Sequence, residues 1–290
     1  MNAEHTSETP LLAKWHFLKT ARAFRRAPLH TLARLAQWRL HCALDRPAHV
    51  RLSRWGVECF LPAQWRGISK LLYAFGEDYE PELIYLEKLL TRGGVFVDVG
   101  ACFGVYALAA SSIVGTEGKV VAFEPAAEAS SVLQRNIQLN HSNNVTAFRM
   151  ALADQDAILR LYHHPDASRN SLGSRAQTNQ EFEEVQTRTL DEVLHEIGLS
   201  HVDVIKMDVE GAEELVLRGA TNLLASSHPT IIFEINRDAA PRLGLLSEEA
   251  WNLLMELGYK FYSVRGSGDS PTPKVTPFDG NVVAIHCGSG

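Results

Sequence analysis

The chain of 290 residues is long enough for one large domain, or for one domain with an appendage. With 46% apolar and 21% charged residues, its composition is that of a globular protein, which excludes a wholly disordered chain. The net charge of −6 is unevenly distributed, because residues 1–70 contain 12 Lys and Arg against 4 Asp and Glu while the remainder is acidic. This distribution disfavours a nucleic-acid-binding protein and indicates a basic appendage on an acidic body.

Cysteine spacing and hydropathy predict the compartment. None of the four cysteines belongs to a C-x-x-C pair, so their spacing matches neither a zinc site nor a disulfide framework. The first ten residues lack the apolar core of a signal peptide. The uncharged run from Val99 to Thr116 contains three glycines, and a buried passage from strand to helix explains it better than a membrane span. We therefore expect a soluble, cytoplasmic protein.

Residues 11–40 combine apolar residues at near-helical spacing with interleaved arginines. The apolar positions are Leu11, Leu12, Trp15, Leu18, Ala21, Leu29, Leu32, Leu35 and Leu40. Pro28 is expected to separate two helices. The segment predicts either a helix packed on the domain or on a partner subunit, or a contact with an anionic membrane. We assign residues 1–74 to a basic helical extension, with short strands from residue 47 onward, and leave the oligomeric state open, with a homodimer as one outcome.

From Val95 the chain alternates between apolar strands and helices. Strands are predicted at 95–99, 119–123, 145–152, 202–207, 230–235, 259–264 and 282–286, and helices at 82–90, 106–113, 126–139, 212–224 and 248–257. Apolar strands separated by helices predict a parallel sheet covered on both faces, and the last strand, with no helix before it, is expected to be antiparallel. Two polar stretches, 163–184 and 266–280, are predicted loops, and the first is a candidate lid or binding loop. Residues 75–290 are therefore predicted to form one α/β domain.

Glycines and acidic residues follow the first two strands of this domain, at the edge where open α/β sheets bind ligands. Asp98 ends the first strand, and Gly100 and Gly104 allow the backbone to turn tightly beside a ligand. Glu124 ends the next strand, 20 residues after Gly104, which is the spacing of an acid that binds ribose hydroxyls. The glycine patterns that bind a dinucleotide pyrophosphate or a nucleotide phosphate are absent. A nucleoside cofactor without phosphates fits best, and S-adenosylmethionine (SAM) is the commonest.

Other residues are assigned to the same cofactor site. Phe103 lies within the glycine turn, and Asp98 is expected to face the ammonium group of SAM or the backbone N–H groups of the turn. Ala151 and Leu152, at the end of the third strand, are expected to contact the adenine ring. Asp154 is placed to accept a hydrogen bond from the adenine amino group, although an ordinary turn or helix-capping role is the alternative.

Asp208 and Glu210 follow the fourth strand and are the candidate catalytic residues. Two carboxylates this close should repel each other, which would raise one pKa toward that of a usable base. Glu210 is the first candidate for the base and Asp208 the second, while Glu213 is expected in the first turn of the following helix. His163 and His164 could serve instead if their loop closes over the site.

A divalent metal is an alternative at the same edge. Glu234 and Asn236 end the fifth strand, and together with Asp208 they are hard oxygen ligands of the kind that suits magnesium. The metal-free interpretation is preferred.

Five short stretches together resemble the FkbM family of SAM-dependent methyltransferases. They are Asp98-Val-Gly-Ala-Cys-Phe-Gly104, Phe123-Glu-Pro125, Asn170-Ser171, Thr189-Leu-Asp191 and Lys206-Met-Asp-Val-Glu-Gly-Ala-Glu213. The resemblance covers roughly residues 75–265, and the last stretch is its most specific motif. It departs at Cys102, where such families commonly have Asn.

The resemblance implies a Rossmann-like class I methyltransferase fold with seven strands, the last antiparallel. It also implies O-methylation of a hydroxyl on a sugar, polyketide or other secondary metabolite. A nicotinamide-dependent oxidoreductase on a similar fold is the alternative, disfavoured by the missing pyrophosphate glycines. A binding protein that kept the fold without catalysis is the third hypothesis.

Overall fold

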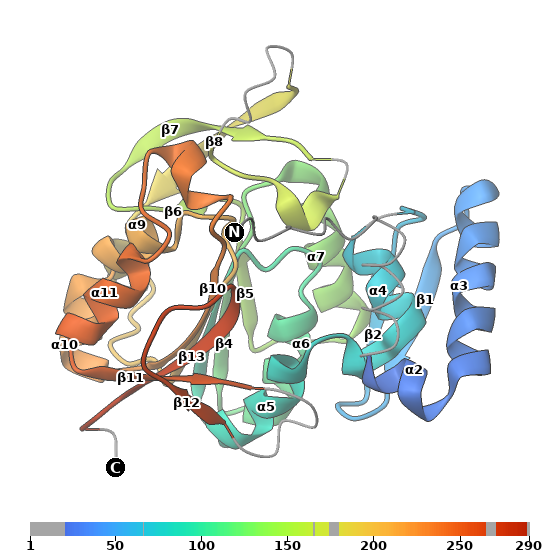
Figure 1. Ribbon diagram of the computed structural model, residues 1–290, viewed down its shortest axis with the longest axis horizontal. Coiled ribbons are helices and arrows are strands. Elements are labelled where there is room, and N and C mark those ends of the chain that lie inside the picture. The colour runs from blue at the N-terminus through green and yellow to red at the C-terminus, as the bar shows by residue number, and fades with distance from the viewer. Residues whose placement is uncertain (1–20, 66, 165, 174–179, 265–270, 289–290) are drawn as a thin grey trace, which may run out of the picture.

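The computed structural model describes residues 21–65, 67–164, 166–173, 180–264 and 271–288, and Figure 1 shows their arrangement. The predicted apolar positions Leu11, Leu12, Trp15 and Leu18 lie outside these ranges. None of the helices within the described ranges has the length and apolar character needed to cross a lipid bilayer.

An eight-stranded sheet with the order β12-β11-β13-β10-β9-β3-β4-β5 forms the centre of the molecule. Its strands are β3 (Val95–Val99), β4 (Lys119–Phe123), β5 (Val145–Phe148), β9 (Val204–Met207), β10 (Thr230–Ile235), β11 (Tyr259–Ser263), β12 (Thr272–Lys274) and β13 (Gly280–His286). The last strand, β13, lies antiparallel between β10 and β11. The seven predicted strands and the antiparallel last strand are confirmed, and the short edge strand β12 is an addition.

Side chains of the central strands alternate between two hydrophobic clusters, one on each face of the sheet. Phe96 and Val120 belong to the first cluster, whereas their neighbours Val97 and Val121 belong to the second. The first cluster is covered by α3 (Pro28–Ala43), α4 (Ile68–Phe75), α5 (Pro81–Leu89), α6 (Val105–Val114) and α7 (Ala127–Leu139). The second is covered by α8 (Leu190–Glu196), α9 (Glu213–Arg218), α10 (Thr221–Ser227) and α11 (Glu249–Glu256). The prediction of a sheet covered on both faces is therefore confirmed.

Two predicted elements are broken in the structure. The strand predicted at 145–152 is β5 followed by β6 (Ala151–Leu152), and β6 pairs with another sheet because the Ala153 N–H donates to the carbonyl of Arg188. The helix predicted at 212–224 is two helices, α9 and α10, which separate around Gly219. A Cβ at Gly219 would collide with the carbonyl oxygen of Ala153, so the chain packs too closely there for a larger residue.

A small second sheet, in the order β6-β8-β7, lies above the end of the main sheet (Figure 1). Its longer strands, β7 (Ala157–Tyr162) and β8 (Phe182–Arg188), were not predicted, and β8 begins inside the stretch predicted as a loop. Only two of the seven side chains of β8 are buried, so its hydrophobic pattern is too weak to indicate a strand. The remaining structured pieces are α2 (Arg22–Arg26), η1 (Gly76–Tyr79), η2 (Ala167–Arg169) and η3 (Ala240–Leu243).

The hairpin of β1 (Ala48–Leu52) and β2 (Val57–Leu61) packs against α7 through two asparagines one helical turn apart. The Asn136 side chain accepts a hydrogen bond from the Phe60 N–H (2.7 Å) and donates to the carbonyls of Phe60 (3.3 Å) and Phe103 (2.9 Å). The Asn140 side chain accepts from the Glu58 N–H and donates to the Glu58 carbonyl, each at 2.7 Å. The two amides thus complete the hydrogen bonds of the free edge of β2, whose backbone groups would otherwise be left unpaired.

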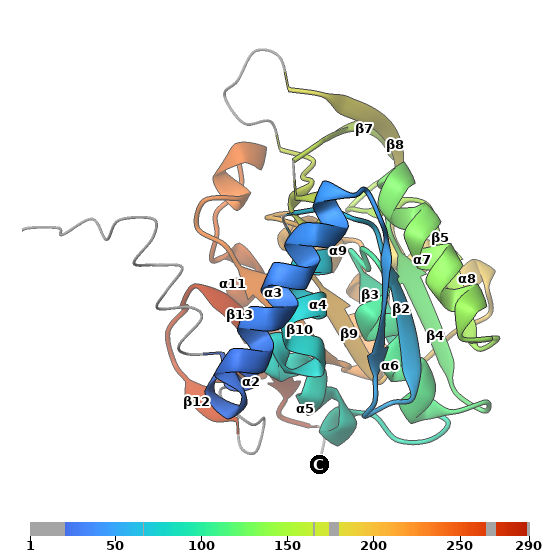
Figure 2. The same ribbon diagram turned by 90° about the vertical axis from the view of Figure 1, so that its right-hand side faces the viewer.

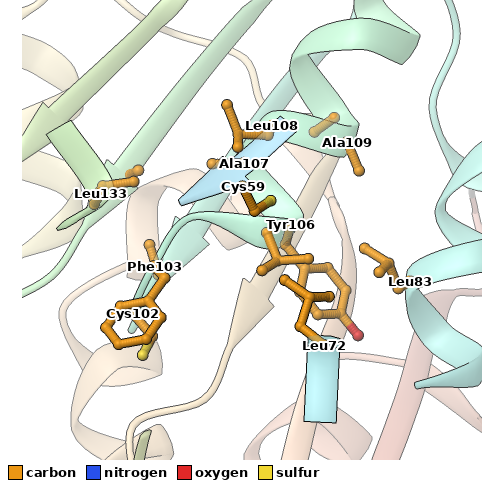
Figure 3. Close-up of a cluster of buried hydrophobic side chains, with 14 of the residues drawn as sticks. Cys59, Leu72, Leu83, Cys102, Phe103, Tyr106, Ala107, Leu108, Ala109 and Leu133 are labelled. Carbon is orange, nitrogen blue, oxygen red and sulfur yellow. The ribbon is translucent and has the colours of Figure 1, made fainter. Parts of the chain in front are cut away.

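The hairpin and α4 share one hydrophobic cluster with the domain (Figure 3). Cys59 and Leu72 from the first 74 residues pack with Phe103, Leu108 and Leu133 from the domain. The boundary at residue 74 stays a prediction, but the packing around it is continuous. Among the described residues, all four cysteines are free thiols.

Candidate active site

A cavity of about 350 Å³ lies at the carboxyl ends of β3, β4, β9 and β10. Five predicted cofactor residues line it, namely Asp98, Gly100, Glu124, Ala151 and Leu152. The candidate catalytic carboxylates Asp208 and Glu210 line the same cavity, with Glu234 and Asn236 beside them. The structure therefore brings residues from four separate strand ends to one enclosed space.

The glycine turn after β3 is shaped by close approach to the neighbouring strand. The N–H groups of Gly100 and Ala101 both donate to the carbonyl of Phe123 at 2.9 Å. Gly100 has a φ of 78°, and a Cβ at this position would collide with the carbonyl oxygen of Asp208. Only glycine fits this turn, which keeps open the part of the cavity between β3 and β9.

Glu124 ends β4 with both carboxylate oxygens oriented by backbone N–H groups. Its Oε2 accepts from Cys102 at 2.8 Å, and its Oε1 accepts from Ala126 at 2.9 Å. Burial raises the pKa of Glu124 to about 7, while these two hydrogen bonds act against the rise. Each carboxylate oxygen can accept a second hydrogen bond, so Glu124 remains able to bind the two hydroxyls of a ribose.

Asp98 is buried at the end of β3, and its Oδ2 has no hydrogen-bond partner among the described residues. Burial raises the pKa of Asp98 to about 7, although the nearby Lys206 ammonium acts in the opposite direction. A buried carboxylate oxygen without a partner costs free energy unless a ligand supplies a donor. Together with Gly100 and Glu124, this orphaned atom fits a bound nucleoside that carries an ammonium group.

Lys206 on β9 is a buried cation among carboxylates. Its Nζ lies 2.9 Å from Asp208 Oδ2 and 4.9 Å from the centre of the Tyr106 ring. Burial disfavours the ammonium, but Asp208, Glu80 and Asp98 outweigh this effect and raise the pKa of Lys206 above its usual value. The Tyr106 hydroxyl in turn donates to Glu80 at 2.7 Å. One cation therefore compensates part of a strongly acidic cavity wall.

Glu210 lies deeper than Asp208 and has an unusual backbone conformation. Its φ of 51° is in the left-handed region, which costs a residue other than glycine roughly 1 kcal/mol or more. Glu210 Oε2 accepts a hydrogen bond from Asn236 Nδ2 at 3.4 Å, and Oε1 lies 3.9 Å from Arg169 Nε. The expected repulsion between Asp208 and Glu210 is relieved because each carboxylate has its own cation, Lys206 or Arg169.

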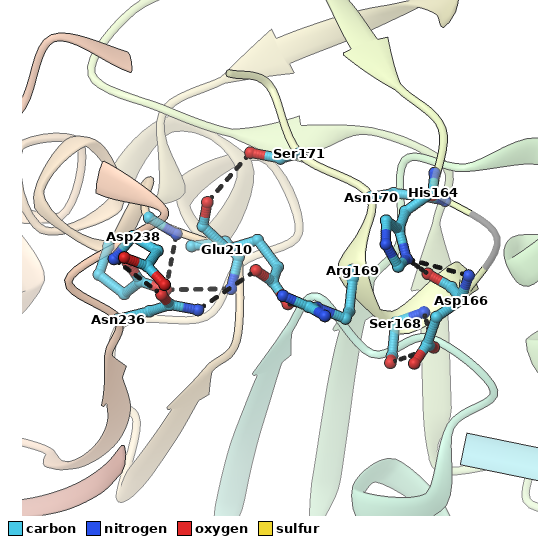
Figure 4. A network of polar contacts seen from close by, with 12 residues as sticks. His164, Asp166, Ser168, Arg169, Asn170, Ser171, Glu210, Asn236 and Asp238 are labelled. Atoms are coloured by element: carbon cyan, nitrogen blue, oxygen red, sulfur yellow. Dashed lines mark hydrogen bonds and ion pairs between the residues drawn. The ribbon is translucent and has the colours of Figure 1, made fainter. Parts of the chain in front are cut away.

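The loop after β7 covers Glu210, as Figure 4 shows. The Ser171 hydroxyl donates to the Glu210 carbonyl at 3.0 Å, which fixes the loop over the end of β9. Asn170 accepts from the His164 N–H at 2.8 Å, and Asp166 accepts from the Ser168 hydroxyl at 2.6 Å. The position of this loop agrees with the predicted role of a cover over the site. The loop side chain that approaches the Glu210 carboxylate is Arg169, whereas the sequence had suggested His163 or His164.

Four predicted site residues do not line the cavity. Phe103 is fully buried in the hydrophobic cluster, and Gly104, with a φ of 82°, caps α6 against Leu133. Asp154 is exposed, because the chain leaves the main sheet before it and turns toward α9. His163 is not among the residues that line the cavity; its Nε2 lies 3.7 Å from Glu183 Oε1, and its backbone N–H continues the β7–β8 pairing. The structure therefore gives no support to Asp154 as an adenine ligand or to His163 as a base.

Sequence reasoning missed several lining residues from the start of the domain. Tyr79 and Glu80, beside η1, line the cavity opposite Lys206 and Asp208. Burial raises the pKa of Glu80. The acidic run Glu77–Glu82 was a visible signal, but nothing in its spacing indicates contact with a strand more than 100 residues away.

One of the three candidate metal ligands, Asp208, already forms an ion pair. Asp208, Glu234 and Asn236 all line the cavity, but Asp208 is paired with the Lys206 ammonium. In the described part of the chain, no three His, Cys, Asp or Glu side chains form a group that could hold a metal ion. A divalent ion at Asp208 would lie beside this ammonium and be repelled by it, so a metal role stays a separate hypothesis.

A mostly parallel sheet with the antiparallel strand β13 between β10 and β11, a glycine turn after β3 and an acid at the end of β4 define the class I methyltransferase fold. A family model described as the methyltransferase FkbM domain matches residues 98–261, more than half of the chain. The chain belongs to the FkbM methyltransferase family.

Individual relatives cover only part of the chain. It is 34% identical over 142 residues to "Methyltransferase 1" from Beauveria bassiana (strain ARSEF 2860), covering 42% of this chain and 57% of that protein. It is 31% identical over 153 residues to "Methyltransferase sdnD" from Sordaria araneosa, covering 42% and 59%. The chain thus matches less than two thirds of the length of these relatives. A crystal structure of the methyltransferase FkbM from Methylobacillus flagellatus KT aligns with a TM-score of 0.45 and 15% identity over 75% of this chain and 53% of that one.

Proposed function

We propose that this chain is a SAM-dependent O-methyltransferase that acts on a hydroxyl group of a small molecule, in the class of sugars, polyketides and other secondary metabolites. The observation that carries the proposal is one shared cavity, which is lined by Asp98, Gly100 and Glu124 and also by Glu210. The first three residues suit a nucleoside with an ammonium group, and the buried Glu210 suits an acceptor that must lose a proton. Family membership favours this reaction over the nicotinamide-dependent alternative.

The reaction requires alignment of an acceptor oxygen with an electrophilic methyl group, exclusion of water and removal of one proton. When bound, SAM supplies a methyl group on a positively charged sulfur. Glu124 would hold the ribose hydroxyls, and the unpartnered Oδ2 of Asp98 would accept a hydrogen bond from the ammonium group. The carboxylate of Glu210 would accept the hydroxyl proton of the acceptor, whose oxygen would bond to the methyl carbon while the bond from sulfur to that carbon breaks and a neutral thioether leaves. The loop at Arg169 to Ser171 would exclude water from the space around Glu210.

Asp208 has a different role in this proposal. Its Oδ2 is already engaged by the Lys206 ammonium at 2.9 Å. We assign Asp208, Lys206 and Glu80 to positioning the acceptor through hydrogen bonds. Their mixture of carboxylates and one ammonium suits a polar molecule with several hydroxyl groups.

Two measurements test the proposal. Calorimetry should detect SAM binding to the purified protein and no binding of NAD, whereas tight NAD binding without SAM binding would contradict it. Small-molecule extracts are then incubated with the protein and methyl-labelled SAM, and mass spectrometry identifies the labelled product. Label on carbon or nitrogen would contradict O-methylation while leaving methyl transfer intact. A parallel incubation with EDTA, followed by magnesium, tests the metal hypothesis, because the metal-free reaction predicts no effect.

A further inference from the structure

The helix α3 carries apolar side chains on two opposite faces. Its inner face contains Thr31 and Trp38, and Trp38 is fully buried with its Nε1–H donating to the Gln64 carbonyl at 3.0 Å. Its outer face contains leucines that are 82%, 42%, 59% and 53% exposed, namely Leu29, Leu32, Leu40 and Leu44 just beyond the helix end. A helix packed on one side only has no folding reason to be apolar on the other.

The outer residues form one continuous stripe. Exposed alanines lie between the leucines, at positions 33, 36 and 43, so an apolar residue recurs every three or four positions along the helix. Figure 2 shows α3 at the front of the molecule, with its length across the face that the viewer sees. With 16 residues, the helix is about 24 Å long. We call this set, Leu29 to Leu44, the leucine stripe.

Arginines surround the leucine stripe. Residues 21–46 contain six arginines, no lysine and a single acid, Asp45. Arg22 and Arg26 form long ion pairs with Asp78, at 3.7 and 3.8 Å, and Arg34 donates to the Tyr73 carbonyl. The others, Arg25, Arg39 and Arg46, are exposed.

A hollow between α2, α3 and η1 contains both basic and acidic side chains. Arg26, His30, Arg34 and Arg51 line this hollow, opposite Glu77 and Asp78. It is large enough for a small anionic group, and it lies along the helix edge that the arginines already make basic.

We propose that α3 is a docking surface for an anionic lipid bilayer, with the helix lying in the plane of the membrane. The leucine stripe would enter the boundary between headgroups and acyl chains, and Arg25, Arg39 and Arg46 would contact lipid phosphates. A second copy of the chain is a poorer occupant, because pairing along the stripe would bring two sets of arginines together with only Asp45 to neutralise them. A nucleic acid would attract the arginines but would leave the leucines exposed.

Helix α3 is connected to the cavity through one intervening helix, α4. Helix α4 packs against α3 on one side, and its residues Ile68 and Leu71 line the cavity on the other. Membrane binding would therefore hold the cavity within about two helix diameters of the lipid surface, roughly 20 Å. The proposal does not depend on which molecule is methylated.

Vesicle flotation with the full-length protein tests this surface. Vesicles of phosphatidylcholine with about 30% phosphatidylglycerol present an anionic surface, and pure phosphatidylcholine vesicles serve as the neutral reference. We expect binding to the anionic vesicles at about 50 mM NaCl that falls sharply at about 500 mM, where the charges are screened. The double variant Leu29→Gln/Leu40→Gln should bind at least about tenfold more weakly although its charge is unchanged.

A matched control distinguishes binding through the leucine stripe from nonspecific binding through other exposed apolar residues. Leu246 and Val275 are 71% and 92% exposed and lie outside α3, so Leu246→Gln/Val275→Gln should bind as well as the unchanged protein. Arg25→Gln/Arg39→Gln should weaken binding and flatten its salt dependence. Thermal melts of all variants should agree within a few degrees, because every substituted side chain is exposed.

Four outcomes would overturn the proposal. The first is absence of binding to anionic vesicles at low salt, and the second is equal binding by the Leu29→Gln/Leu40→Gln variant. The third is a dimer in sedimentation velocity that this variant dissolves, which would identify a second copy as the occupant. The fourth is binding that appears only when residues 1–20 are removed, which would mean that the chain's own first segment covers the stripe.

Discussion

Two buried polar side chains flank the Gly100–Gly104 turn, and they differ in how their hydrogen bonds are satisfied. Asn136 is fully buried and makes three hydrogen bonds to the backbone of Phe60 and Phe103. Asp98 is also buried, but its Oδ2 has no partner in the part of the chain that the structure describes. A buried polar group whose bonds are complete serves the fold, whereas one left incomplete indicates where a ligand binds. Substitutions that separate folding from activity test this distinction.

The largest expected effect is on turnover at Glu210. Glu210→Gln keeps the size of the side chain but removes its negative charge and basicity, so kcat should fall by about 10²–10⁴-fold, the range for a general base. SAM affinity should stay nearly unchanged. Single-turnover methyl transfer to the identified acceptor measures the effect, and Asp208→Asn, expected to lose less, is the matched control. Normal turnover by Glu210→Gln with an inactive Asp208→Asn would reverse the two roles.

The next largest effect is expected on the free energy of unfolding when Asn136, whose side-chain hydrogen bonds are complete, is replaced. Asn136→Ala would leave the Phe60 N–H and the Phe103 carbonyl buried without partners, so the free energy of unfolding should fall by about 2–4 kcal/mol. Urea unfolding measures this loss. Asn140→Ala, at a partly exposed position of the same helix, should lose less than half as much. If both variants are as stable as the unchanged protein, the two amides do not stabilise the packing of the β1–β2 hairpin on α7.

A smaller effect is expected on cofactor binding. Glu124→Ala removes the carboxylate that would bind the ribose hydroxyls, so SAM affinity should weaken by roughly 1.5–3 kcal/mol, the range for hydrogen bonds to charged groups. Calorimetry on the folded variant measures the change. Asp154→Ala is the control and should leave affinity unchanged, because Asp154 lies outside the cavity. Unchanged affinity in Glu124→Ala would contradict the ribose assignment.

The pH dependence follows from the buried carboxylates. Burial raises the pKa values of Asp98 and Glu124 to about 7, well above those of an unfolded chain, so the folded state binds their protons more tightly. Their contribution to stability is complete below the unfolded pKa and is lost as the pH rises through about 7.

The variant Asp98→Asn, which cannot ionise, isolates one of these groups. We subtract the melting temperature of the unchanged protein from that of the variant at each pH. This difference should be about 2–4 °C larger at pH 8 than at pH 5. SAM affinity of the unchanged protein should rise over the same pH range, because the ionised carboxylates are the better hydrogen-bond acceptors. A difference in melting temperature that does not vary with pH would show that Asp98 is ionised throughout.

The smallest effect is expected at His163. Since this side chain faces Glu183 and not the cavity, His163→Ala should change kcat by less than about twofold. A loss of about 10²-fold or more, in a variant that still binds SAM, would restore the histidine as a candidate base.

The central sheet could be predicted because its strands are apolar on both faces and are separated by helices of ordinary length. The sequence was equally sufficient to predict that Asp98, Gly100 and Glu124 lie together in one cavity, because they follow consecutive strands of the sheet. The prediction was wrong where a strand changes sheets: the break after Phe148 moves Asp154 away, and no local pattern marks it. Glu80, Arg169 and the pairing of Lys206 with Asp208 depend on contacts between distant segments, which periodicity does not reveal.

The left-handed backbone at Glu210 has a consequence for the protein's evolution. Glycine at this position would relieve the strained φ and remove a buried carboxylate, so Glu210→Gly should be tolerated by the fold or should even stabilise it. A laboratory selection for heat resistance alone would drift toward this substitution and yield a sturdier but inactive enzyme. Thermostable variants of this protein should therefore be screened for the proposed turnover at every round, with residue 210 held fixed in the library.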